Sequence, residues 1–265
     1  MREITSKDNA AIKLALRVKQ KKHRQQERLY LVEGHKMLQE ILACPEALAR
    51  VYLTRETAAA YYPGLKDMSG VECLLVDERL MAILSDTETP QGVVALAHKP
   101  QHNVNLFTQR PGLLLLLDQI QDPGNMGTII RTAWGFSVDA VLLTPDCVDP
   151  FAPKAVRASM GGIFHVPIID SVDMEVLHEF KNSSFQILGS LPAADKTLFE
   201  QDFTGGRIIV VGNESRGISA KILKLCDHCF KIPLNPRVDS LNAAMACAII
   251  TVEALRQRSA GLLPH

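Results

Sequence analysis

The sequence lacks several features that mark familiar classes of protein. No apolar run approaches the roughly 20 residues that a membrane-spanning helix needs, and the first 25 residues contain no apolar signal-peptide core. The dinucleotide-binding pattern Gly-x-Gly-x-x-Gly, the phosphate-binding Gly-Lys-Ser/Thr and the nucleophile pattern Gly-x-Ser-x-Gly are all absent. These absences argue against a membrane protein, an exported protein, a dinucleotide-dependent oxidoreductase, a P-loop nucleotidase and a serine hydrolase.

Cysteine is present, but not in a pattern that builds a framework. Six cysteines in 265 residues show no regular spacing, which indicates a reducing compartment and predicts a cytoplasmic protein. Cys226 and Cys229 have the CxxC spacing of a zinc site, but zinc takes four ligands and the sequence holds no second pair. We therefore expect ordinary buried thiols and no metal.

The formal net charge is zero, yet the charges are segregated. Residues 1–28 carry nine basic and three acidic side chains, whereas the other 237 residues carry 20 basic and 26 acidic ones. A basic segment of this kind attracts phosphate backbones, although it is also the ordinary composition of a solvated helix face. The candidate RNA-binding side chains are Lys13, Arg17, Lys19, Lys21, Lys22, Arg24 and Arg28.

Alternating strand and helix patterns divide the chain into two α/β regions. Residues 1–98 predict a small domain in which a helix over 54–62 is stopped by Pro63-Gly64. Residues 99–112 are polar and read as a linker. Residues 113–265 predict a parallel sheet, whose first strand is the apolar run 113–117, and a final helix over about 241–258 that packs inside the fold or against a partner subunit.

Three loops of unusual composition follow strands of this second region, where parallel sheets bind ligands. The first runs from Asp118 into a helix, with Asn125 in the first turn and Arg131 about two turns further on. The free backbone N–H groups at the start of this helix, together with Arg131, could bind an anion such as a phosphate. The second is Gly212–Gly217, in which Asn213 and Glu214 can bind hydroxyl groups. A capped strand-to-helix turn and a surface turn with a solvated Glu214–Arg216 pair are the simpler interpretations.

The third loop follows the strand near residues 228–232. Two prolines hold it extended, and Ser240 is expected to start the last helix as its N-cap, with Asn242 in the first turn. Taken alone, this segment has an ordinary structural explanation.

Taken together and in this order, the loops resemble the three motifs of the SpoU (TrmH) family of RNA 2′-O-ribose methyltransferases, in the SPOUT superfamily. The resemblance rests on Leu117-Asp-x-Ile-x-Asp-Pro-x-Asn-x-Gly-x-Ile-x-Arg-Thr-Ala133, on Gly212-Asn-Glu-x-x-Gly-Ile-Ser219, and on Ile232-Pro-Leu with Ser240-Leu-Asn-Ala243. Tyr30-Leu-Val-Glu-Gly34 is similar to a segment of the family's N-terminal substrate-binding domain.

The resemblance implies an α/β fold: a knotted, parallel-sheet methyltransferase domain after a smaller domain similar to an RNA-binding fold of ribosomal proteins. It also implies a homodimer and S-adenosylmethionine as cofactor. Arg131 would be the central catalytic residue, with Asn125, Glu214, Ser240 and Asn242 around it. The implied cofactor-binding residues are Leu188, Gly189, Gly212, Asn213, Ile232, Leu234 and Leu241.

The implied reaction is methylation of a ribose 2′-hydroxyl in structured RNA, with ribosomal RNA (23S type) favoured over transfer RNA. Because a guanidinium stays protonated in proteins, we expect Arg131 to clamp a phosphate and polarise the 2′-oxygen rather than act as a base. A non-catalytic RNA-binding ribosome-assembly factor is the alternative from another class, and the intact Arg131, Glu214 and Asn242 argue against it.

Overall fold

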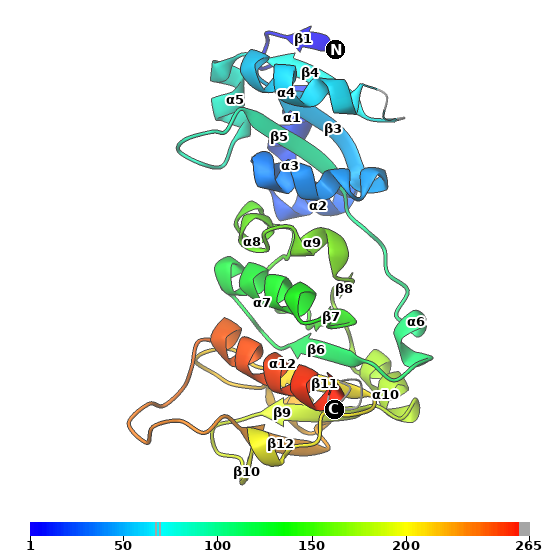
Figure 1. Cartoon of the computed structure of the whole chain (residues 1–265), viewed down its shortest axis with the longest axis vertical. Helices are drawn as coiled ribbons and strands as arrows, with labels where there is room; N and C mark the ends of the chain where they lie inside the picture. Colours follow the sequence, from blue (N-terminus) through cyan, green and yellow to red (C-terminus); the bar gives the residue numbers. More distant parts are fainter. Residues whose placement is uncertain (67, 69, 260–265) are drawn as a thin grey trace. The chain divides into compact units, whose positions relative to one another are not determined.

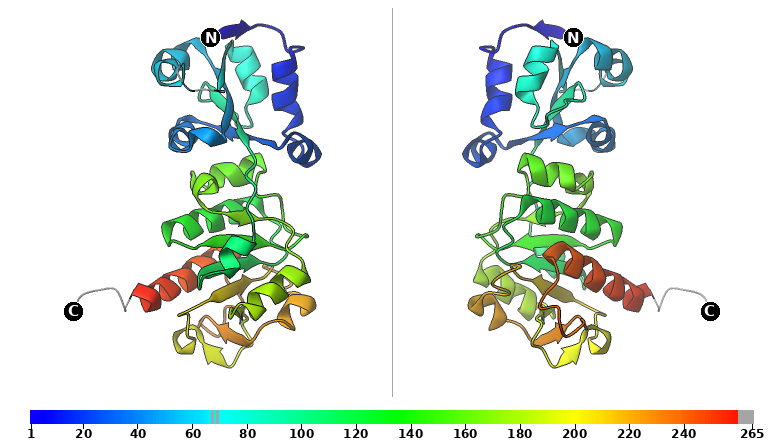
Figure 2. Two further views of the ribbon diagram at one scale, coloured as in Figure 1. Left: turned by 90° about the vertical axis from the view of Figure 1, so that its right-hand side faces the viewer. Right: turned by 90° about the vertical axis from the view of Figure 1, so that its left-hand side faces the viewer.

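A computed structural model describes residues 1–66, 68 and 70–259 (Figures 1 and 2). The chain divides into two compact units. The first comprises Met1–Pro100 and Asp149–Phe164, and the second comprises Gln101–Val148 and the chain from His165 onward. No helix in the described residues is both long and apolar enough to cross a membrane.

The first unit is a five-stranded mixed sheet with helices on both faces. Its strand order is β1-β4-β3-β5-β2, and β5 runs antiparallel to both of its neighbours. Helices α1 and α5 lie side by side on one face, and α3 and α4 lie on the other (Figure 2). The elements are β1 (Arg2–Ile4), α1 (Ala10–Arg17), α2 (Lys21–Glu27), β2 (Leu29–Glu33), α3 (His35–Leu42), η1 (Pro45–Ala47), β3 (Leu48–Leu53), α4 (Arg55–Leu65), β4 (Glu72–Val76), α5 (Glu78–Leu84) and β5 (Val93–His98).

A segment from later in the chain also belongs to this unit. It contains α8 (Pro153–Ala158) and most of α9 (Gly162–His165). Phe151 packs its ring against Tyr30 of β2, with centroids 4.9 Å apart, and Arg157 forms an ion pair of 3.0 Å with Asp86. The sequence places these residues within the second α/β region, but their apolar and charged partners lie in the first unit.

The second unit is a seven-stranded sheet in which every described strand pair is parallel. Its strand order is β10-β12-β9-β11-β6-β7-β8. The elements are α6 (Asn105–Thr108), β6 (Leu113–Leu117), α7 (Pro123–Gly135), β7 (Ala140–Leu143), β8 (Ile168–Ile169), α10 (Met174–Asn182), β9 (Gln186–Ser190), β10 (Lys196–Thr197), η2 (Leu198–Glu200), β11 (Arg207–Val211), α11 (Ala220–Leu223), β12 (His228–Lys231) and α12 (Ala243–Ser259).

The central strands of this sheet are covered on both faces. All five residues of β6 are buried, which explains the continuous apolar sequence Leu113–Leu117. Helices α10 and α11, with side chains of α6, pack on the face that carries Leu114 and Leu116, and α7 and α12 lie together on the opposite face (Figure 2). The predicted parallel α/β architecture is therefore confirmed.

Two local predictions are corrected, and one helix is added. Helix α4 continues through Pro63 to Leu65: the φ fixed by the proline ring is compatible with a helix, and the proline lies in the last turn, so few residues depend on the interrupted hydrogen bond. Helix α2 had no assigned bounds: a solvated helix face was one interpretation of residues 1–28, but Lys21–Glu27 has no apolar stripe that would set its limits. The last helix starts at Ala243 rather than at Ser240: the Asn242 side-chain oxygen accepts from the backbone N–H groups of Ala244 and Met245 and so occupies the capping position.

Candidate active site

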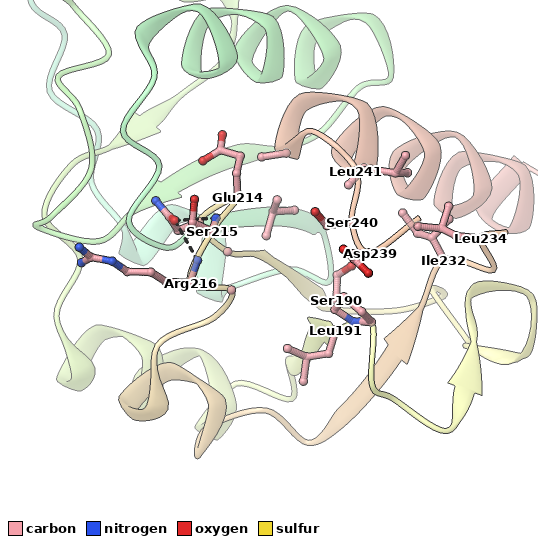
Figure 3. A pocket seen from close by; sticks show the side chains of 17 residues that line it. Ser190, Leu191, Glu214, Ser215, Arg216, Ile232, Leu234, Asp239, Ser240 and Leu241 are labelled. Carbon is pink, nitrogen blue, oxygen red and sulfur yellow. Dashed lines mark hydrogen bonds between the residues drawn. The ribbon is translucent and has the colours of Figure 1, made fainter. Parts of the chain in front are cut away.

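The loops that follow β9, β11 and β12 meet at the carboxyl edge of the second sheet and enclose a cavity of about 400 Å³ (Figure 3). Because β11 pairs with β9 and β9 pairs with β12, these strands deliver their ends to one place. The lining residues are Ser190, Leu191, Pro192, Val211, Gly212, Asn213, Glu214, Ser215, Arg216, Gly217, Ile232, Leu234, Asp239, Ser240, Leu241, Ala243 and Ala246.

Gly212 opens the loop that forms one wall of the cavity. A Cβ at this position would lie 2.4 Å from the carbonyl carbon of Gly217 and 2.5 Å from the backbone nitrogen of Ile218. Both neighbours are backbone atoms, which cannot move aside as a flexible side chain could. The tight approach of the two ends of this loop therefore requires glycine.

Asn213 holds the same loop in shape. Its side-chain oxygen accepts from the backbone N–H groups of Ser215 and Arg216, at 2.9 and 3.1 Å, and its side-chain nitrogen donates to the carbonyl of Gln119 at 2.9 Å. Backbone hydrogen bonds in both directions join Asn213 to Gly217. The polar groups of Asn213 are thus engaged within the protein, and its contribution to the cavity is to fix the wall.

A buried carboxylate anchors the far end of the loop. Asp118 is fully buried, and its Oδ2 accepts from the backbone N–H of Ser219 at 2.6 Å. The other oxygen of Asp118 and the hydroxyl of Ser219 are both buried and have no hydrogen-bond partner among the described residues. The first and second sequence motifs are therefore joined at the base of the site.

Three of the predicted catalytic side chains form a hydrogen-bonded chain. Asn125 donates from Nδ2 to Glu214 Oε1 at 2.5 Å and accepts at Oδ1 from Asn242 Nδ2 at 2.9 Å. Asp122 caps α7 by accepting from the backbone N–H of Asn125, which places Asn125 in the first turn. One residue from each motif takes part, and Glu214 carries the chain to the cavity wall.

Arg131 stands apart from this cavity. It lies on the exposed face of α7 with Thr128 and Trp134, and its guanidinium makes no hydrogen bond or ion pair with any described residue. Trp134 stacks on His165 with ring centroids 4.4 Å apart and remains 38% exposed. The side chain of Arg131 is therefore exposed and available to a ligand.

The structure brings together most of the predicted cofactor-binding residues, but not all of them. Gly212, Asn213, Ile232, Leu234 and Leu241 line the cavity, as does Ser240 from the predicted catalytic group. Leu188 and Gly189 do not line it, because they lie within β9, before the strand end at Ser190, and are buried in the sheet.

The loop after the strand that ends near residue 190 was expected to help form the cofactor pocket, but its lining residues were not among those named. Ser190, Leu191 and Pro192 are the wall residues there, and Asp239 was missed in the third loop. The signal available in the sequence was the strand end at Ser190 itself, since residues just beyond a parallel strand face the ligand edge.

Gly189 has a packing role instead. A Cβ there would lie 3.1 and 3.2 Å from the sulfurs of Cys226 and Cys229. Burial is the largest of the influences that raise the pKa of the Cys226 thiol to about 12, and all six cysteines of the chain are free. No group of three or more His, Cys, Asp or Glu placed to hold a metal ion occurs among the described residues.

The predicted RNA-binding side chains in the first unit differ in their environments. Lys21 and Lys22 are exposed at the start of α2 and have no partner in the described part of the chain. Lys13 pairs with Asp8 at 3.0 Å and Arg17 with Glu27 at 2.7 Å, both at exposed positions. Arg28 is also exposed and donates weakly, at 3.4 Å, to the carbonyl of Lys99.

Arg24 and Lys19 are turned into the protein. Arg24 is 4% exposed, bonds Asp149 at 2.7 Å through two nitrogens, and donates to the carbonyls of Val18 and Lys19. Lys19 donates to the carbonyls of Ile83 and Ser85, and burial is the largest of the influences that lower its pKa. The charged groups of Arg24 and Lys19 are therefore occupied by hydrogen bonds within the first unit.

Comparison with known proteins gives this geometry a family. Residues 112–252 match the SpoU rRNA Methylase family, and residues 9–95 match the MRM3-like substrate binding domain. The chain is 35% identical to an uncharacterized tRNA/rRNA methyltransferase of Synechocystis, over 98% of this chain and 96% of the relative. It is 31% identical to the Bacillus subtilis 23S rRNA (guanosine(2553)-2′-O)-methyltransferase RlmP, over 94% of this chain and 98% of the relative.

Solved structures agree along the whole chain. The AdoMet-bound rRNA methyltransferase of Sinorhizobium meliloti is 27% identical, with 99% of each chain covered and a TM-score of 0.86. The SpoU methyltransferase AviRb of Streptomyces viridochromogenes, in complex with the cofactor AdoMet, is 27% identical, with 96% of this chain and all of the other covered and a TM-score of 0.83. Because the family model matches the region that carries the three motifs, and solved structures of the family share the fold, the chain belongs to the SpoU family of rRNA methylases.

Proposed function

We propose that this protein transfers a methyl group from S-adenosylmethionine to a ribose 2′-hydroxyl of ribosomal RNA, in RNA of the 23S type. Its family makes it an RNA methyltransferase that uses S-adenosylmethionine. The observation that carries the proposal is the hydrogen-bonded chain Asn242–Asn125–Glu214, which ends at the wall of the cavity. The relative named as a 2′-O-methyltransferase of 23S rRNA supports the choice of substrate.

The cavity suits S-adenosylmethionine in its size and in its lining. Its volume of about 400 Å³ falls within the usual range for small-molecule sites. Leu191, Leu234 and Leu241 offer apolar surface for an adenine ring, and Asp239 and Ser240 offer polar groups for hydroxyls. When bound, the cofactor supplies an electrophilic methyl group on a sulfonium centre.

The side chains of the protein would position the ribose rather than react with it. Glu214, held by Asn125, can accept a hydrogen bond from a ribose hydroxyl at the cavity wall. Arg131 would clamp a phosphate next to the target nucleotide with its two-pronged guanidinium, since this group stays protonated and binds phosphate in a fixed geometry. Such positioning removes much of the entropic cost of bringing the 2′-oxygen to the methyl group.

The first unit would hold the RNA. We retain residues 1–98 as a substrate-binding domain, 99–112 as the linker and 113–265 as the methyltransferase domain. Lys21 and Lys22, with Lys13, Arg17 and Arg28 near them in sequence, are the exposed cations that would meet phosphates. Arg24 and Lys19 would support this surface from inside the fold.

We further propose a homodimer formed through α12. Met245, Ile249 and Val252 are 59%, 38% and 47% exposed at helical spacing, which makes an apolar stripe on the outside of the helix. Light scattering at micromolar concentration should give twice the monomer mass, and Ile249→Glu should return the monomer mass. A monomer in the unaltered protein would overturn this part.

Two further features complete the proposal. The carboxyl-terminal segment would thread through a loop of the sheet domain to form a trefoil knot, which an experimental structure of the full chain would test. The protein would act in the cytoplasm, where free thiols persist and ribosomal RNA is assembled. Fractionation of cells that express the tagged full chain would locate it.

The decisive experiment is transfer of a radioactive methyl group from S-adenosylmethionine to ribosomal RNA from cells that lack the gene, followed by mapping of 2′-O-methyl positions. One new 2′-O-methyl group in the 23S-type RNA is expected, and RNA from wild-type cells should accept none. Modification of transfer RNA alone would overturn the choice of substrate. Cofactor binding without methylation of any cellular RNA would point to a non-catalytic assembly factor.

A further inference from the structure

A second cavity lies on the opposite side of the loop that walls the cofactor cavity. Its volume is about 650 Å³, and it is lined by Gln119, Gln121, Asp146, Asn213, Ser215 and Arg216. These residues come from the ends of the three adjacent strands β6, β7 and β11. Asn213, Ser215 and Arg216 also line the first cavity, so the two spaces share one wall.

The shared wall is rigid, and its side chains diverge. The side-chain amide of Asn213 forms hydrogen bonds with the backbone of Ser215, Arg216 and Gln119. Figure 3 shows Arg216 extending away from Ser240 and Leu241, which lie across the cofactor cavity. The guanidinium of Arg216 is exposed and makes no hydrogen bond or ion pair with a described residue. It is therefore free to donate to a ligand on the side of the second cavity.

Gln119 is held in a conformation that glutamine rarely adopts. Its φ is 60°, in the left-handed region. Its backbone N–H donates to Thr144 Oγ1 at 3.1 Å and its carbonyl accepts from Asn213, so the surrounding structure fixes the strained backbone. Its side-chain amide lines the second cavity and bonds no described residue. Backbone strain of this kind is found more often at active sites and ligand-binding sites than elsewhere.

The remaining lining is polar and has no aromatic ring. Gln121 donates from its amide nitrogen to the carbonyl of Asp146, which leaves its amide oxygen as an acceptor. The Asp146 carboxylate is exposed beside it. Paired donors and acceptors of this kind, amides with a guanidinium and a carboxylate, match the edges of nucleobases.

From this arrangement we propose that the second cavity receives the base of the target nucleotide, with Gln119, Gln121 and Arg216 hydrogen-bonding to its edge. The inference rests on the proposed function. The base of a nucleotide is attached directly to its ribose, so a ribose bound at Glu214 places its base close by. When the nucleotide is drawn out of its stack, the base must occupy a neighbouring space. The cavity behind the shared wall is that space, and its polar lining reads the base by hydrogen bonds rather than by stacking.

The test uses Gln119→Gly in the full-length protein. Glycine adopts a φ of 60° without strain, so the variant removes the side-chain amide of Gln119 and does not strain the backbone. The control is Ser137→Gly, which removes a side chain from an exposed position of the second unit that also has a positive φ, of 54°. Calorimetry should give equal affinity for S-adenosylmethionine in both variants and the unaltered protein.

Methyl transfer to transcripts of the modified RNA region, with each of the four bases in turn at the target position, then decides the role of the cavity. The unaltered protein and Ser137→Gly should prefer one base. Gln119→Gly should lose about tenfold in kcat/KM on that base and most of the preference, as expected for loss of a base contact. Equal rates on all four bases in the unaltered protein, or an unchanged preference in Gln119→Gly, would overturn the proposal.

Arg216→Gln distinguishes a base contact from a phosphate contact. A base contact predicts a changed preference among the four bases, whereas a uniform loss on all four would mean that Arg216 holds a phosphate and would remove it from the proposal. If the unaltered protein methylates no RNA, the proposed function fails. The cavity is then tested with the four nucleoside 5′-monophosphates, and no saturable NMR shift of the Gln119 side-chain amide with any of them would overturn this inference as well.

Discussion

Asn242 donates its side-chain N–H to the side-chain oxygen of Asn125 at 2.9 Å, across 117 residues of sequence. Asn242 also caps α12, and Asn125 lies in the capped first turn of α7. The contact therefore joins the amino-terminal ends of two helices, and Asn125 passes the link on to Glu214. The orientation of Glu214 depends in this way on two helix starts.

Replacement of Asn125 should damage catalysis more than cofactor binding. Asn125→Ala removes both side-chain hydrogen bonds and frees Glu214, so we expect kcat to fall by about 100-fold, a typical loss for a misplaced positioning group. Affinity for S-adenosylmethionine, measured by calorimetry, should change little. The control is Thr132→Ala on the same helix, whose hydroxyl donates to the carbonyl of Thr128 and bonds no other described residue. Equal kcat in the two variants would contradict the positioning role.

Gly212→Ala should abolish cofactor binding. The added Cβ meets the backbone of Gly217 and Ile218 at about 2.5 Å, so the loop that walls the cavity must open. Gly135→Ala is the control, because a Cβ at that position on α7 has no neighbour within 4 Å. Calorimetry with S-adenosylmethionine should show no saturable binding to Gly212→Ala and normal binding to Gly135→Ala. Tight binding by both variants would mean that the loop can adapt.

The parts of the fold that sequence predicted well are those fixed by local pattern. The continuous apolar runs in β6 and β11 are typical of strands buried on both faces, and the polar residues after them marked the ligand edge. The bounds of helix α2 could not be predicted because it has no apolar stripe, and its one buried side chain is the cation Arg24. Its partner Asp149 lies 125 residues away, a distance over which pattern carries no information.

The candidate site shows the same limit. Residue types and motif order pointed to Asn125, Glu214 and Asn242, but their mutual hydrogen bonds arise from tertiary packing of α7 against α12 and of β6 against β11. The serine of Ser240-Leu-Asn was a reasonable helix cap. The asparagine two residues later took that place instead, and Ser240 was left to line the cavity.

The buried ion pair of Arg24 and Asp149 should matter for stability. Both side chains are at most 7% exposed, so Arg24→Met leaves a carboxylate buried without its counter-charge. We expect about 3–5 kcal/mol of lost stability in denaturant unfolding, as is typical when one partner of a buried pair is removed. Lys22→Met, at an exposed position two residues earlier, should stay within about 0.5 kcal/mol of the unaltered protein.

The double variant Arg24→Met/Asp149→Leu separates charge burial from packing. Removing both charges should recover most of the loss, because the cost of the single variant is mainly the unpaired carboxylate. If the double variant is as unstable as Arg24→Met, the other hydrogen bonds of the pair, from Arg24 to the carbonyls of Val18 and Lys19 and from the backbone N–H of Phe151 to Asp149, are the more important contribution.

Binding to RNA should weaken with salt, mainly through the exposed lysines of α2. Lys21→Gln and Lys22→Gln should each lower the slope of log affinity against log salt concentration by about 1, the value expected for one lost phosphate contact. Filter binding or fluorescence anisotropy with 23S-type RNA would measure it. Lys19→Gln should leave the slope unchanged, since Lys19 donates to Ile83 and Ser85. Affinity that is independent of salt would exclude an electrostatic interface.

Asp227 should make the second unit sensitive to acid. Burial alone would raise the pKa of this carboxyl, but the hydrogen bond and charge of Lys181, with the N–H of Ile187, hold the pKa below its ordinary value of 3.8. A lowered pKa in the folded state means that ionised Asp227 stabilises the fold above about pH 4, and that this contribution is lost as the pH falls through the folded value.

Asp227→Asn should therefore be less stable than the unaltered protein at pH 6, and the difference should shrink below pH 4. Lys181→Met should reduce the same pH dependence, because it removes the cation that lowers the pKa. If urea unfolding gives parallel curves of stability against pH for Asp227→Asn and the unaltered protein, the ion pair does not contribute to acid sensitivity.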